Sequence, residues 1–195
     1  MPRLFTPFQL RSLTLPNRVV VSPMCQYSAV EGRAQAWHAV HLGQFATGGA
    51  GLVFVEATAV EPAGRITPGC LGLYDDATEA ALAGVVRTLR SVSRTAIGIQ
   101  LGHAGRKASS SRPWEGGQQI GADAGGWTPV APSAVAIAEH EAPPHALERH
   151  EMDALKARFV DAVLRADRLG LDAIEVHGAH GYLLHEFLSP LANRR

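Results

Sequence analysis

Two histidines and a tyrosine lie close together near the end of the chain. His177 and His180 are three residues apart, Tyr182 follows, and all three come after the apolar residues Ile174 and Val176. A neutral imidazole donates one N–H and a phenol is a weak acid, so such a group can bind a developing oxyanion and deliver a proton. The residues alone leave two other interpretations open: structural histidines beside an ordinary tyrosine, or a His-x-x-His metal site. The metal site has no His-Glu-x-x-His motif, cysteine pair or obvious carboxylate nearby to complete it.

Four short apolar runs predict the strands that position these side chains. They are residues 18–24, 51–58, 96–105 and 171–181. Nearly continuous apolar runs are typical of strands covered on both faces, as in parallel sheets. Between them, helical spacing of apolar residues predicts two amphipathic helices and a weaker one over residues 37–47. The expected buried positions are Leu82, Val85, Val86 and Leu89 in the first, and Leu155, Phe159, Val163 and Ala166, ahead of a stop at Gly170, in the second.

The repeated strand–helix order predicts an α/β fold, either a doubly wound sheet or a (β/α)₈ TIM barrel. A polar or thiol group follows each predicted strand, and a barrel collects its chemistry at the carboxyl ends of several strands. A doubly wound nucleotide fold instead carries a glycine fingerprint after its first strand, which "SPMCQYS" lacks. The barrel is therefore the predicted fold. The groups in question are Cys25, Gln26 and Tyr27, then Glu56 and Thr58, then Gln100 and His103, then His177, His180 and Tyr182.

Residues 106–150 predict a long loop after the third strand, rich in Gly, Pro and Ser. Such a loop on the catalytic face is either a lid or pocket wall, or a packed Ω-type excursion without function. Arg106 and Lys107 open it, and there they either steer a phosphate-bearing nicotinamide cofactor or solvate the loop. His38 and His41 repeat the three-residue spacing inside the weaker helix, and we interpret them as structural.

The composition argues against several classes of protein function. The 18 Lys and Arg residues balance the 18 Asp and Glu residues, and no basic run is interleaved with aromatics, which argues against a nucleic-acid partner. The N-terminal segment is broken by Pro2, Pro7 and Pro16, so neither a signal peptide nor a membrane span is expected there. Two cysteines, Cys25 and Cys70, are too few for a disulfide framework. We expect a cytoplasmic protein in which both cysteines are thiols.

Six motifs, in this order and spacing, resemble one known family. They are "SPMCQYS", "EATAV", "GRITPG", "QLGHAGRK", "APSA" and "HGAHGYLLHEFLSP", and together they extend over essentially the whole chain. The resemblance is to the Old Yellow Enzyme family of FMN-dependent ene-reductases, in particular to its bacterial xenobiotic-reductase-like branch with an active-site cysteine. It implies a TIM barrel that holds FMN, takes hydride from NADPH or NADH, and passes it to the activated C=C bond of an α,β-unsaturated carbonyl or related xenobiotic compound.

The resemblance also assigns roles to individual residues. His177 and His180 are implied to bind the substrate carbonyl, Tyr182 to donate a proton to the α-carbon, and Tyr27 to line the substrate side. Cys25 is implied to lie near the flavin and to tune its redox behaviour, whereas Cys70 receives no role. The residues implied to line the flavin are Ser22, Pro23, Met24, Cys25, Ala57 and Gln100.

The chain departs from the family in length. A typical barrel needs about 250 residues, so 195 residues with a long loop cannot close eight strands. Residues 1–195 are therefore expected to form the incomplete N-terminal part of a single FMN-binding barrel domain, about four βα units. The alternative is a catalytically incompetent half-barrel that needs a partner chain, because four parallel strands leave two open edges. Association into a homo-oligomer is left open.

Overall fold

A computed structural model describes residues 2–195, which are built around one parallel sheet of four strands. The order is β3 (Val20–Val21), β4 (Leu52–Ala59), β5 (Ala96–Gly102) and β8 (Ala173–Val176), and every neighbouring pair is parallel. Each strand adds beside the one before it, whereas a doubly wound sheet reverses direction partway through its order. The predicted barrel-type succession of four strands is confirmed.

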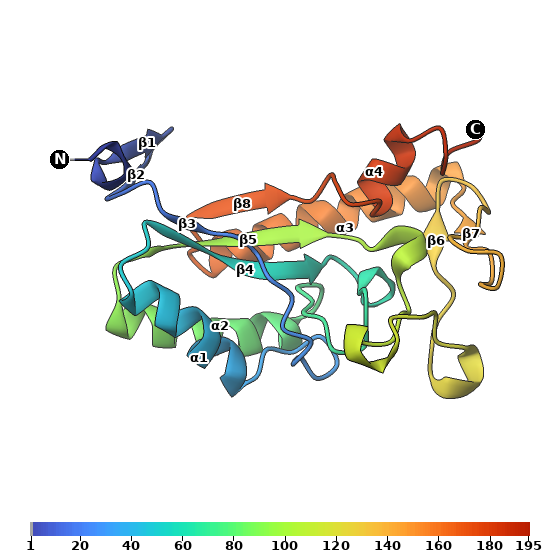
Figure 1. Cartoon of the computed structure of the whole chain (residues 1–195), viewed down its shortest axis with the longest axis horizontal. Helices are drawn as coiled ribbons and strands as arrows, with labels where there is room; N and C mark the ends of the chain where they lie inside the picture. The colour runs from blue at the N-terminus through green and yellow to red at the C-terminus, as the bar shows by residue number, and fades with distance from the viewer. Residues whose placement is uncertain (1) are drawn as a thin grey trace.

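Three helices connect these strands: α1 (Ala36–Thr47), α2 (Asp76–Val92) and α3 (Arg149–Arg168). The weaker predicted helix is α1, and all four predicted positions on α2 are buried. The prediction for α3 is wrong at Val163, which is 36% exposed, because the buried side of the helix carries Leu155, Ala162 and Ala166. Figure 1 shows α1 and α2 side by side against the sheet. The main core lies between sheet and helices, and its strand residues are Val53, Val55, Ile97, Ile99 and Leu101.

Asp75 fixes the start of α2. Its carboxylate accepts a hydrogen bond from the Thr78 backbone N–H at 2.7 Å, and the Thr78 hydroxyl lies 3.1 Å from the Asp75 backbone N–H. We expect Asp75→Ala to lower the free energy of unfolding by about 1 kcal/mol, because one N-terminal N–H of the helix loses its acceptor. Urea denaturation followed by circular dichroism measures this. Asp75→Asn keeps a side-chain oxygen as the acceptor, so its free energy of unfolding should fall much less. An equal fall in both variants would show that capping is not the cause.

The N-terminal segment forms a hairpin that the sequence did not predict. Strands β1 (Phe8–Leu10) and β2 (Leu13–Leu15) pair antiparallel after a single 3₁₀ turn at Arg3–Phe5. Leu15 packs with Leu52 and Ala96, the first residues of β4 and β5. The hairpin therefore covers the amino ends of the central strands, opposite the end where the chemistry is expected.

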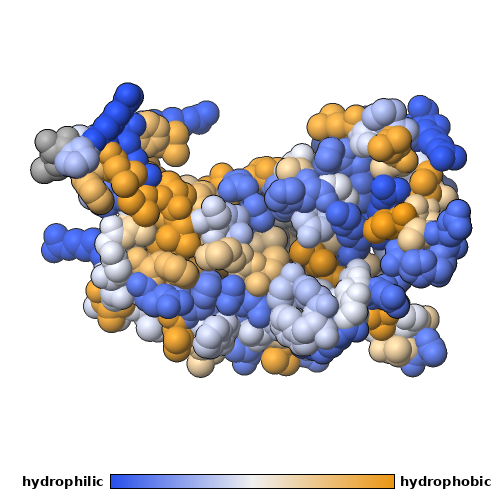
Figure 2. All heavy atoms as spheres, in the orientation of Figure 1, coloured by the Kyte–Doolittle hydropathy of each residue, from blue (hydrophilic) through white to orange (hydrophobic). Residues whose placement is uncertain are grey.

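The outer strands are shorter and more exposed than predicted. Strand β3 has two residues instead of the seven of 18–24, and β8 has four. Val20 is 47% exposed and Val176 54%, so the prediction that all four strands are covered on both faces is wrong for the two edge strands. Figure 2 shows apolar surface reaching solvent below the N-terminal hairpin. The sheet thus ends in two unpaired edges.

The carboxyl ends of the strands point toward the long connection and the C-terminal helix (Figure 1). Residues 106–150 hold a few short elements and a two-residue parallel pair of strands. No helix among residues 2–195 is long and apolar enough to cross a membrane. The short elements at this end are the 3₁₀ turns Pro62–Gly64, Gly105–Lys107, Pro113–Glu115 and Ala122–Ala124, the strands β6 (Val130–Ala131) and β7 (His145–Ala146), and helix α4 (Leu183–Leu188).

Candidate active site

His177, His180 and Tyr182 form one aromatic cluster just beyond β8. The His177 ring centroid lies 5.1 Å from that of His180 and 5.0 Å from that of Tyr182, with both pairs edge to face. His177 is still held to the sheet, because its backbone N–H donates to Leu101 O at 2.9 Å. The structure therefore brings together the three residues that the sequence singled out.

A left-handed turn produces this arrangement. His180 has φ 59° and Gly181 has φ 74°, and the Tyr182 N–H donates to Ala179 O at 3.1 Å. Histidine tolerates this backbone region better than bulky or β-branched residues do. Lys107 fixes the turn from the neighbouring loop, since its ammonium group donates to His180 O at 2.7 Å. This turn brings the His180 ring edge to face with the His177 ring.

Burial sets the protonation states of His177 and Tyr182. The pKa of His177 is lowered by desolvation first and by the nearby His180 second. The pKa of Tyr182 is raised, mainly by burial. At neutral pH, His177 is therefore a neutral N–H donor and Tyr182 a protonated phenol. Both states suit a site that binds an anionic oxygen and supplies a proton.

A cavity of about 330 Å³ lies in front of the cluster. The side chains come from all four sheet strands or from the segments that follow them, as expected at the carboxyl end of a barrel. Met24 is the predicted flavin-side residue that does not line this cavity; it is 41% exposed. The lining residues are Ser22, Pro23, Cys25, Ala57, Gln100, Glu175, His177, His180 and Tyr182.

The amide of Gln100 has a fixed orientation in this cavity. Its Nε2 donates to Glu175 Oε1 at 2.7 Å, between directly paired residues of β5 and β8. With its NH₂ group engaged, Gln100 offers its carbonyl oxygen as an acceptor for an N–H of a ligand. The pyrimidine part of an isoalloxazine ring carries such an N–H, so this donor and acceptor set fits a flavin edge.

A second cavity, of about 250 Å³, shares Tyr182 with the first. Tyr27 and Lys107 line it, together with residues of the long loop such as Pro113 and Ile137. The Tyr27 ring packs edge to face on Trp114 at 5.5 Å. The long loop thus forms a pocket wall, as one of the two sequence interpretations expected.

Arg106 and Lys107 are both engaged within the chain. The Arg106 backbone N–H donates to Glu186 Oε1 at 3.0 Å, and its guanidinium donates to Val135 O at 3.2 Å. Glu186 is 1% exposed, and burial raises its pKa to about 7. Among residues 2–195, Glu186 Oε2 and Arg106 Nε have no hydrogen-bond partner. These two residues form a buried polar contact behind the His180 turn.

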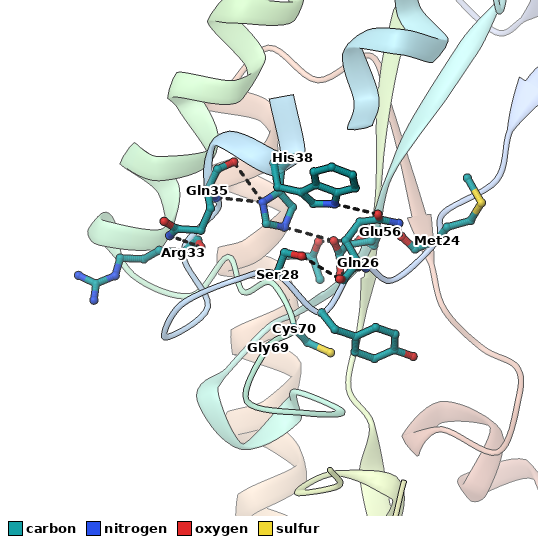
Figure 3. Close-up of polar contacts among 12 residues, drawn as sticks. Met24, Gln26, Ser28, Arg33, Gln35, His38, Glu56, Gly69 and Cys70 are labelled. Atoms are coloured by element: carbon teal, nitrogen blue, oxygen red, sulfur yellow. Dashed lines mark hydrogen bonds and ion pairs between the residues drawn. The ribbon is translucent and has the colours of Figure 1, made fainter. Parts of the chain in front are cut away.

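A buried contact between His38 and Glu56 supports the segment that carries Cys25. His38 Nε2 lies 3.4 Å from Glu56 Oε1, with both side chains 2% exposed. The Gln35 backbone N–H donates to His38 Nδ1 at 2.9 Å, which leaves the ring proton on Nε2, facing the carboxylate. The other oxygen of Glu56 accepts the Gln26 N–H at 3.1 Å. Figure 3 shows this chain of contacts from Gln35 through His38 and Glu56 to Gln26.

A β-bulge makes this contact available. The pairing of β4 with β5 passes from Val55↔Ile99 to Ala57↔Gln100 and leaves Glu56 unpaired. A bulge redirects the side chains around it. Ala57 consequently lines the large cavity beside Gln100, while Glu56 meets His38 and Gln26. The bulge therefore places two neighbouring residues on different sides of β4: Ala57 at the cavity and Glu56 at the buried contact with His38.

We expect Glu56→Ala to lower the free energy of unfolding by about 2 kcal/mol, because the Gln26 N–H loses its acceptor and His38 loses its buried carboxylate neighbour. Urea denaturation measures the loss, and cysteine reactivity reports whether the Cys25 segment loosens with it. Glu56→Gln retains one acceptor oxygen, so its free energy of unfolding should fall less than that of Glu56→Ala. Equal free energies of unfolding for Glu56→Ala and the unaltered chain would show that this contact does not stabilise the fold.

Sequence reasoning interpreted His38 as structural and named Glu56 at its strand, but it missed the contact between them and the positions of Glu175 and Glu186 at the site. One signal was available, since Glu56 and Glu175 are charged residues inside otherwise apolar strands, where a charge needs a partner. The partners themselves were not readable, because they lie 18 to 80 residues away. No group of three or more His, Cys, Asp or Glu side chains placed to hold a metal ion occurs within the described part of the chain.

Comparison with known proteins agrees with this geometry. The family model described as the NADH:flavin oxidoreductase / NADH oxidase family matches residues 3–195. An NADH:flavin oxidoreductase of Gibberella zeae is 47% identical over 99% of this chain and 48% of its own length. An NADPH dehydrogenase of Listeria welshimeri is 45% identical over 100% of this chain and 54% of its own length. The chain spans about half the length of the curated relatives it matches.

Solved structures show the same relation. Morphinone reductase in complex with tetrahydroNAD superposes with a TM-score of 0.83 at 34% identity, over 100% of this chain and 54% of that one. An Old Yellow Enzyme homologue from Zymomonas mobilis gives a TM-score of 0.83 at 26% identity, over 100% of this chain and 53% of that one. The four-stranded unit described above is thus similar to about half of each of these proteins.

Proposed function

Since the chain belongs to the NADH:flavin oxidoreductase / NADH oxidase family, we propose that it supplies one half of an FMN-dependent ene-reductase. Reducing equivalents come from NADPH or NADH, and the substrate is the activated C=C bond of an α,β-unsaturated carbonyl or related xenobiotic compound. We place the protein in the cytoplasm, with small molecules as its ligands. One observation carries the proposal: His177, His180 and Tyr182 face a cavity that Cys25, Ala57 and Gln100 also line.

FMN, when bound, supplies hydride chemistry that side chains lack. Gln100 would hold the pyrimidine edge of the ring through the carbonyl oxygen that Glu175 leaves available. Ser22, Pro23 and Cys25 would line one side of it, and Ala57 would allow close approach. These are contacts to the ring.

The histidines would act on the substrate. Hydride addition to the β-carbon of an enone places negative charge on the carbonyl oxygen, and preorganised N–H donors stabilise that charge. His177, neutral because burial lowers its pKa, donates one N–H, and His180 beside it adds a second donor. Tyr182 remains protonated because burial raises its pKa, so its O–H is the proton source for the α-carbon.

Tyr182 also separates two chambers. It lines the 330 Å³ cavity, which we assign to the flavin ring, and the 250 Å³ cavity walled by Tyr27 and the long loop, which we assign to the substrate. Tyr27 stands in the second chamber, held by Trp114. His177 and His180 line the first cavity, so the carbonyl group of a substrate bound beside Tyr27 would have to extend past Tyr182 to meet them.

A second candidate function has an observation in its favour. The chain spans about half of its relatives, and its edge strands expose Val20 and Val176. The second candidate is a half-barrel that becomes active only with a partner chain, and it would have the same length and the same exposed edge strands. The two candidates differ in whether the 195 residues act without a further half.

We would test the proposal with a hybrid protein in which this chain replaces the matching half of the Listeria welshimeri NADPH dehydrogenase. We expect the hybrid to purify with bound FMN, to be bleached by NADPH, and to recover its colour when 2-cyclohexenone is added without oxygen. The 195-residue chain, assayed alone with FMN, decides between the two candidates. A folded, FMN-loaded hybrid that NADPH bleaches and the enone leaves bleached would contradict the assignment of the substrate.

A further inference from the structure

Lys107 carries a positive charge that the proposed reaction does not use. The residue lines the 250 Å³ cavity together with Tyr27 and Tyr182. Its ammonium group donates to His180 O at 2.7 Å and lies 5.5 Å from the centroid of the Tyr182 ring. The charge is therefore held beside the proton donor, in the cavity that we assign to the substrate.

No acid of the chain neutralises this charge. Of the two lysines, Lys156 forms an ion pair with Asp153, whereas Lys107 forms none with any carboxylate of residues 2–195. The buried Glu186 accepts a backbone N–H instead. Glu141 lines the same cavity, but it is not paired with Lys107 either. An ammonium group has three N–H donors, so two remain for a ligand.

The rest of the cavity wall offers few other donors. The hydroxyl groups of Ser110 and Ser111 both donate to backbone carbonyl oxygens. The apolar part of the wall includes Ile66, Pro113 and Ile137. An unpaired cation in a chamber of this kind favours a ligand that brings an anionic group to it, because a charge-assisted hydrogen bond is stronger than a neutral one.

We propose that Lys107 binds a carboxylate of the substrate, so that the preferred substrates are enones with a carboxylate beyond the β-carbon end of the alkene. This specificity rests on the proposed function, which places the carbonyl oxygen at the histidines of the first cavity. The α-carbon must then lie within reach of Tyr182, and the molecule continues through the β-carbon into the second cavity, where Lys107 stands. Lys107 is thereby assigned to the substrate, and not to a cofactor phosphate or to loop solvation.

The test uses the hybrid protein with trans-4-oxo-2-pentenoate and its methyl ester. Both compounds have the same enone, and the acid alone is charged at neutral pH. We expect a higher kcat/KM for the acid than for the ester, and Lys107→Met should lower this acid-to-ester ratio about 10–100-fold. The ratio is the measured quantity because Lys107 also holds the His180 turn, and a displaced turn would slow both compounds alike.

Three further variants separate charge from structure. Lys107→Arg keeps a cation and should retain most of the preference for the acid. Glu141→Gln removes the acid that lines the same cavity, so the preference should rise. Lys156→Met removes an exposed lysine and should leave the ratio unchanged. A higher KM for NADPH but not for NADH in Lys107→Met, with the ratio unchanged, would overturn the proposal and assign Lys107 to the cofactor.

Binding is measured separately from reduction. The saturated acid 4-oxopentanoate and its methyl ester are titrated into the oxidised hybrid while the flavin absorbance is recorded. Tighter binding of the acid that is lost in Lys107→Met would support the proposal, and if neither enone were reduced it would contradict the proposed function alone. Reduction of both enones with a ratio that Lys107→Met leaves unchanged would overturn the proposal while the proposed function stands.

Discussion

The His177→Ala, His180→Ala double variant of the hybrid protein should reduce 2-cyclohexenone with a kcat/KM about 10²–10³-fold lower than the unaltered hybrid. The reason is electrostatic: both N–H donors aimed at the developing oxyanion are lost, and removing such donors costs this much in acyl-transfer enzymes. Their rings lie 5.1 Å apart beside the cavity, so a single oxygen can meet both. Steady-state kinetics with NADPH and the enone measure the change, and flavin content shows that the cofactor site is retained.

Two control variants sharpen this prediction. His177→Asn, His180→Asn keeps a side-chain N–H at each position and should recover part of the lost rate. His150→Ala, on the exposed face of α3, should leave the rate unchanged. If the alanine and asparagine double variants were as active as the unaltered hybrid, the histidines would be structural, which is one of the interpretations that the sequence left open.

Glu186→Gln should make the chain more stable at pH 8 by about 2–3 kcal/mol. Burial raises the pKa of Glu186 from 4.5 to about 7 in the folded state, even though Arg106 and Lys107 act in the opposite direction. An acid whose pKa is raised on folding stabilises the fold below its unfolded pKa, and that contribution is lost as the pH rises through the folded pKa. The stability of the unaltered chain should therefore fall between about pH 4.5 and pH 7.

The matched measurement is urea denaturation at pH 5 and at pH 8. Glutamine resembles the protonated acid, so Glu186→Gln should differ little from the unaltered chain at pH 5, and the gain should appear at pH 8. Glu139→Gln, at an exposed loop position, should change the unfolding free energy little at either pH. A gain of the same size at both pH values would show that the charge of Glu186 is not the cause.

The order of the four central strands could be predicted from the sequence, because period and composition are local signals. Helix α2 shows this well: its four apolar positions at i, i+3, i+4 and i+7 are all buried. The edge strands were predicted less well. Val20 and Val176 have the composition of buried strand residues, but exposure depends on whether a neighbouring strand exists, and no local pattern records that.

The candidate site divides in the same way. His177, His180 and Tyr182 are close in sequence, so their grouping followed from a single motif. Glu56 could be recognised as a charge within a strand. Its partner His38 could not be predicted, because the bulge in β4 sets the direction of the Glu56 side chain.

The most direct measurement of the central claim follows the hydride itself. The hybrid protein would be given NADPH deuterated at the transferable position of the nicotinamide, with 2-cyclohexenone and without oxygen, and the product examined by NMR and mass spectrometry. The proposed function predicts deuterium on the β-carbon of the saturated ketone, with less of this product from the His177→Ala, His180→Ala variant. Oxidation of the NADPH with the enone recovered unchanged, or deuterium at any other carbon, would contradict it.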